Sequence, residues 1–131
     1  MFLKLYAIAL PVIVMLDMVW LGIVAKDFYK SQLGYIMRSD FNLTVAAIFY
    51  VIFTAAIVIF VIAPAAEKQS LSHALLLGFF FGFTTYAAYD LTNLATLKDW
   101  PIMVTIVDMV WGGILSALVS TITLYLATRI I

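Results

Sequence analysis

Three aspartates, Asp17, Asp90 and Asp108, lie inside long apolar runs that contain no lysine or arginine. A charged acid at the centre of a bilayer costs ~2.5 to 3.5 kcal/mol on insertion scales, and three unpaired acids would also repel one another. Burial and repulsion both favour the protonated form, and a bound cation or water inside the protein would relieve the same cost. The chemistry that these residue types offer is therefore the binding and release of a proton or a cation.

The composition and the lengths of the apolar runs predict an all-α membrane protein. Of 131 residues, 66% are hydrophobic and 11% are charged, whereas a soluble domain is roughly half apolar and about a quarter charged. The runs at residues 5–25, 41–66, 71–97 and 101–128 each reach the length of about 20 residues that a membrane-spanning helix needs. They lack the alternation of membrane β-strands. We expect a four-transmembrane-helix bundle that forms one integral membrane domain, residues 1–131.

The three acids are predicted to share one level of this bundle. Each lies eight or nine residues from a polar or interfacial marker, Lys26, Lys98 or Trp100, and alternating spans put these markers on the same side. At a rise of ~1.5 Å per residue, each carboxyl is roughly 12 to 14 Å from that boundary. This is close to the midplane of a hydrocarbon core about 30 Å thick. Tyr50, on the second span, is expected at a similar depth.

Helical spacing adds neighbours to each acid. Tyr86 and Asn93 are four residues before and three after Asp90, so they share its face, and a tryptophan lies three residues after each of the other two acids. The expected ligand- or proton-binding residues are Asp17, Asp90, Asp108, Asn93, Tyr50, Tyr86, Trp20 and Trp111. A structural interpretation stays open, in which neutral aspartic acids hydrogen-bond neighbouring side chains and hold the helices together.

The sequence "DMVW" followed by any residue and then Gly-Ile occurs twice, at residues 17–23 and 108–114. The two copies are on helices predicted to run in opposite directions. Inverted repeats about an axis in the membrane plane are typical of transporters whose site lies between the repeats. The repeat predicts inverted pseudo-symmetry, although chance similarity of a short motif remains the alternative.

Residues 26–40 separate the first two spans and are predicted to form an interfacial amphipathic helix. Basic residues lie apart from its apolar positions. The positions predicted to share the apolar face are Tyr29, Leu33, Ile36 and Met37.

The segments "LDMVWLG", "YDLTNLATLKDW" and "DMVWGG" together resemble the signature of a family of small bacterial integral membrane proteins catalogued as a domain of unknown function. The resemblance covers essentially the whole chain, and the tyrosine-aspartate-x-threonine-asparagine element is its most specific part. It implies a multi-pass protein of the bacterial inner membrane. It carries no established activity and no assigned catalytic residues.

Three classes of function remain open at this stage. The first is proton- or cation-linked transport or binding of a small molecule at the aspartates. The second is a membrane-embedded enzyme that acts on lipid, using paired aspartates as acid and base or to hold a divalent metal. The third is a structural or assembly subunit.

The expected partners are membrane lipids, a small-molecule or ion substrate and a second copy of the chain in a homodimer. The chain has no cysteine, and its formal net charge of zero gives no nucleic-acid footprint. We expect no cofactor beyond a bound cation.

Overall fold

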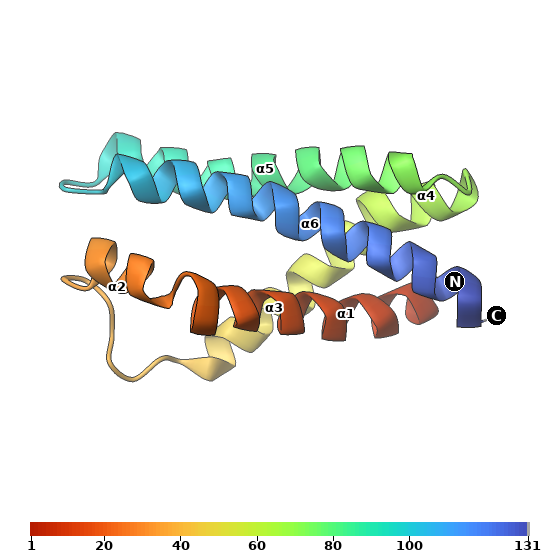
Figure 1. Cartoon of the computed structure of the whole chain (residues 1–131), viewed down its shortest axis with the longest axis horizontal. Coiled ribbons are helices and arrows are strands. Elements are labelled where there is room, and N and C mark those ends of the chain that lie inside the picture. The colour runs from red at the N-terminus through yellow and green to blue at the C-terminus, as the bar shows by residue number, and fades with distance from the viewer. Residues whose placement is uncertain (131) are drawn as a thin grey trace.

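Four long helices form the protein, and they confirm the predicted all-α architecture. The computed structural model describes residues 1–130 and has no strand among them (Figure 1). Each long helix has the length and apolar composition to cross a membrane. The spans are Phe2–Val24, Leu43–Glu67, Leu71–Thr96 and Ile102–Ile130.

Two of the spans contain a wider helical turn. The first consists of α1, Phe2–Val19, and a π-helical segment η1, Trp20–Val24. The second consists of α3, Leu43–Ile57, a π-helical segment η2, Val58–Ile62, and α4, Ala63–Glu67. Such turns are rare and are often found at functional sites. In the first span the π-helical segment begins at Trp20 of the repeated "DMVW" motif.

The third and fourth spans, α5 (Leu71–Thr96) and α6 (Ile102–Ile130), form an antiparallel pair (Figure 1). Glycines let their backbones come together. A Cβ atom added to Gly82 would overlap the carbonyl oxygen of Gly112, and one added to Gly78 would lie 2.8 Å from the carbonyl oxygen of Ser116. Small residues that allow close approach are the usual means of helix association in membranes. This contact fixes the register of α5 against α6.

Side chains of loop residues cap the N-termini of the second and third spans. The Asn42 side chain accepts a hydrogen bond from the backbone N–H of Val45, and the Ser70 hydroxyl accepts one from the N–H of His73. Both cap a helix N-terminus whose first N–H groups have no partner within the helix. The spans therefore begin at residues 43 and 71 for a local chemical reason.

The helix between the first two spans is shorter than predicted. It is α2, Lys26–Leu33, and the chain then turns at Gly34. Ile36 and Met37 lie outside the helix, so the predicted apolar face over residues 26–40 was wrong. The hydroxyl of Tyr35 donates a hydrogen bond of 2.5 Å to the carbonyl oxygen of Asp99 in the α5–α6 connection. Tertiary contacts therefore end this helix early and tie the following turn to the spans.

Both chain ends lie at one end of the molecule, and α2 and the α5–α6 connection lie at the other (Figure 1). We call the second one the α2 end.

Substituting Gly82 by alanine is expected to lower the free energy of unfolding by about 1 to 3 kcal/mol, because the new methyl group overpacks the α5–α6 contact. Gly22→Ala is the matched control, since a Cβ there has nothing within 4 Å. Unfolding in detergent with increasing denaturant measures both variants. Equal loss of stability in the two would contradict this account of the helix pair.

Candidate functional site

Asp17 is a buried carboxyl whose two oxygens both accept hydrogen bonds. The Tyr50 hydroxyl donates to Oδ2 at 2.5 Å, and the Trp111 indole N–H donates to Oδ1 at 3.0 Å. Only 5% of Asp17 is exposed. The three residues come from α1, α3 and α6, so this carboxyl joins three spans through charge-assisted or strong neutral hydrogen bonds.

Asp108, on α6, is bound in a different way. The hydroxyl of Tyr29, on α2, donates to Asp108 Oδ1 at 2.7 Å and accepts a hydrogen bond of 3.1 Å from the Trp20 indole N–H. Burial and the nearby Asp108 carboxylate raise the pKa of Tyr29 far above its ordinary value. The hydroxyl therefore keeps its proton and remains a donor to Asp108.

The two tryptophans of the repeated motif stack on each other. The rings of Trp20 and Trp111 are 4.4 Å apart between centroids and 8° from parallel. Trp111 reaches Asp17 directly, and Trp20 reaches Asp108 through the Tyr29 hydroxyl. Each tryptophan is thus directed toward the acid of the other motif, on antiparallel helices (Figure 1). This reciprocal arrangement connects the two copies of the motif across the α1–α6 contact.

Asp90, on α5, is fully buried and has no hydrogen-bond partner. Its exposed fraction is 0%, and within residues 1–130 neither carboxyl oxygen accepts or donates a hydrogen bond. The ionisable group that interacts electrostatically with Asp90 is the carboxyl of Asp108, across the α5–α6 contact. In that same part of the chain the one ion pair is the exposed Arg38–Asp40 contact of 3.3 Å. Asp90 and Asp108 therefore face each other without a cation.

The acids share one level, which lies toward the α2 end of the spans. Asp90 lies six residues before the last residue of α5, and Asp108 lies six after the first of α6, which is roughly 9 Å from each helix end. Helices α5 and α6 have 26 and 29 residues, more than the about 20 that a bilayer requires. The carboxyls of Asp90 and Asp108 are therefore about two helical turns inside the α2 end.

The other two candidate residues on α5 differ in position. The ring of Tyr86 packs on Gly112, within electrostatic reach of Asp17 and Asp108. Asn93 makes no hydrogen bond to any of the three acids in the described residues, and its side chain lies beside the Tyr89 hydroxyl. The shared helical face therefore correctly predicted that Tyr86 lies near the acids. It did not produce a contact between Asn93 and Asp90.

Tyr29 is the site residue that the sequence analysis missed, because it was assigned to the lipid-facing side of an interfacial helix. It is 79 residues from Asp108 along the chain. No local spacing connects the two residues. The available signal was the phenol itself, a polar group on a predicted apolar face close to an acid-containing span.

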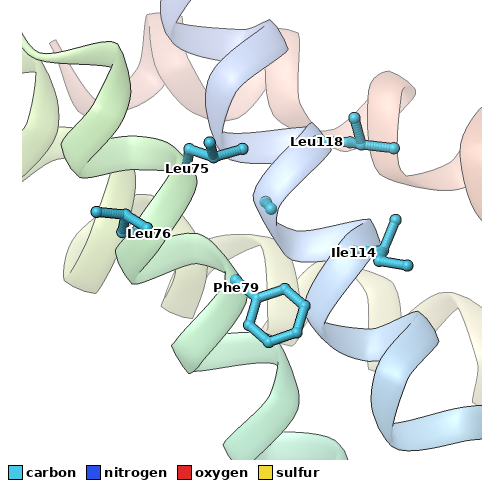
Figure 2. A pocket seen from close by; sticks show the side chains of 6 residues that line it. Leu75, Leu76, Phe79, Ile114 and Leu118 are labelled. Carbon is cyan, nitrogen blue, oxygen red and sulfur yellow. The ribbon is translucent and has the colours of Figure 1, made fainter.

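Two shallow grooves of the surface lie away from the acids. Figure 2 shows an apolar groove of about 350 Å³ between the outer sides of α5 and α6. A second groove of about 390 Å³ lies between η2 and α5 and includes Thr84 and Thr85. The residues that line the first are Leu75, Leu76, Phe79, Ile114, Ala117 and Leu118. None of the three aspartates lines either groove. Among residues 1–130, no three acids or histidines are grouped so that they could hold a metal ion.

Comparison with known proteins gives a family but no activity. Residues 2–125 match the family model described as "Predicted membrane protein (DUF2177)". No curated protein and no solved structure matches the chain.

Removing the Tyr50 hydroxyl is expected to destabilise the protein, because one oxygen of the buried Asp17 carboxyl then loses its donor. Tyr50→Phe should lower the free energy of unfolding by about 1 kcal/mol, the scale of an intramembrane hydrogen bond. Tyr125→Phe is the control, since Tyr125 is 46% exposed on α6. Thermal unfolding in detergent compares the two variants. If both unfolded like the wild type, the Asp17–Tyr50 bond would have no role in holding α1 to α3.

Proposed function

We propose that this chain, which belongs to the DUF2177 family of predicted membrane proteins, binds a proton or a small cation between Asp90 and Asp108. We further propose that it couples this binding to the transport or binding of a small molecule. The location implied by the sequence resemblance is the bacterial inner membrane. Membrane lipids and a second copy of the chain remain the proposed partners.

The observation that supports the proposal most strongly is the Asp90 carboxyl. It is fully buried, neither oxygen has a donor, and its charged neighbour is another acid. Two ionised carboxylates in this setting would pay the cost of burial twice and would repel each other. A single shared proton, or a cation between the two groups, removes most of that cost. The pair is therefore built to hold one positive charge.

Asp17 has a different role in this proposal. Its oxygens are both occupied by the Tyr50 hydroxyl and the Trp111 indole, so it has little capacity left to receive a ligand. A doubly bound carboxyl positions Trp111, which in turn packs on Trp20. We assign Asp17 to the support of the site and the Asp90–Asp108 pair to exchange.

The reciprocal contacts of the repeated motif support a link to movement. In transporters built from inverted repeats, one half rocks against the other around a fixed site. Here the two halves meet at the Trp20–Trp111 stack, next to the acid pair. A change of charge on the pair alters the hydrogen bond that the Tyr29 hydroxyl donates to Asp108. Because the Trp20 indole donates to that same hydroxyl, the change also affects the contact between the two halves.

Proton counting tests the proposal. Purified protein in weakly buffered detergent is titrated, and a pH indicator reports the protons that it takes up. At pH values above the acidic range, the wild type is expected to take up one more proton per chain than Asp90→Asn. In the variant, Asp108 has no second carboxyl with which to share a proton. Asp40→Asn is the control, since Asp40 is an exposed acid that pairs with Arg38 on the surface.

The thermal stability of Asp90→Asn distinguishes an acid that exchanges a proton from one that only forms structural hydrogen bonds. Removing an acid that exists to bind charge should leave the thermal stability of Asp90→Asn equal to that of the wild type or higher. The titration is repeated with sodium and potassium salts, which compete with the proton if the pair accepts a metal cation. If Asp90→Asn matched the wild type in proton count in every salt, the pair would not be an exchange site.

A further inference from the structure

We infer that Tyr29 is the gate of the Asp90–Asp108 pair, and that α2 is a movable cover through which the pair exchanges its proton or cation at the α2 end. The inference rests on the proposed function, because a gate requires a group that exchanges. It assigns a side of access and a residue that controls it.

The hydroxyl of Tyr29 occupies the position that a ligand of Asp108 would need. It donates to Asp108 Oδ1 at 2.7 Å, and the Trp20 indole holds it in place at 3.1 Å. Asp108 is half-buried, whereas Asp90 behind it is fully buried. A proton or cation that comes from the α2 end reaches Asp108 first, and it must displace the Tyr29 hydroxyl to bind that oxygen.

The cover is held to the spans by few contacts. Within residues 1–130, the side-chain hydrogen bonds from residues 26–37 to the spans and their connections are those of Tyr29 with Asp108 and Trp20, and that of Tyr35 with the Asp99 carbonyl. No residue of α2 is buried. Hydrogen bonds between side chains in membranes are weak enough to open and close thermally. Two such attachment points hold α2 closed without fixing it permanently.

Both ends of α2 permit movement. On one side the helix follows the π-helical segment η1 and Ala25, whose backbone is not helical (φ −113°, ψ 8°). Gly22 in η1 has nothing within 4 Å of the position of a Cβ atom. On the other side no helix follows Leu33 until Leu43. A small number of backbone positions at element ends can absorb the rotation of a cover.

The experiment is a pH jump followed in stopped flow with an indicator dye, which gives both the number of protons taken up and the rate. Tyr29→Phe should raise the rate about fivefold, as expected when a barrier loses one hydrogen bond of intramembrane strength. Tyr35→Phe, which releases the second attachment and affects an exposed residue, should also accelerate uptake. Tyr6→Phe is the control, because the Tyr6 hydroxyl bonds the Val51 carbonyl elsewhere in the protein.

The outcomes distinguish the gate from the proposed function. A wild type that takes up no proton attributable to Asp90 refutes the exchange site, and the gate with it. A normal proton count with unchanged rates in both Tyr29→Phe and Tyr35→Phe refutes the gate alone. A slower rate in Tyr29→Phe also overturns it, since the phenol would then conduct protons instead of blocking them.

Discussion

A carboxyl without a counter-ion in a membrane-spanning helix is the constraint on which the rest of this structure depends. Asp90 has no exposed surface and no hydrogen-bond donor, and the group opposite it is a second carboxyl, that of Asp108. In a soluble protein a lysine or arginine often pairs with such a group, whereas the described residues place none at that position. In the proposed function, a positive charge between the oxygens of the two carboxyls stabilises the pair.

The surrounding contacts hold the pair in place. Close approach at Gly82 and Gly112 sets α5 against α6, and Asp90 follows two turns after Gly82 while Asp108 lies one turn before Gly112. The doubly bound Asp17 and the tryptophan stack then attach α1 to α6 beside the pair. Packing and hydrogen bonding thus bring together two groups that would otherwise separate, which is the condition for a charge-dependent switch.

The features that depend on local spacing could be predicted from the sequence. Apolar run length predicted the four spans, and counting from loop residues predicted that the acids share a level. Contacts between segments that are distant along the chain could not be predicted from it. The interaction of Tyr29 with Asp108 requires α2 to end at Leu33 and fold against the spans, and periodicity favoured a longer amphipathic helix. Asn93 shares the helical face of Asp90 yet lies beside Tyr89, because two residues on one helical face can contact different neighbours.

The most direct measurement of the central claim is carbon-13 NMR of the side-chain carboxyl groups, with each aspartate assigned by its Asn variant. The chemical shift of the carboxyl carbon distinguishes the protonated from the ionised form. In buffer free of metal cations at neutral pH, we predict one proton shared between the carboxyls of Asp90 and Asp108. Full ionisation of both Asp90 and Asp108 under those conditions would contradict it.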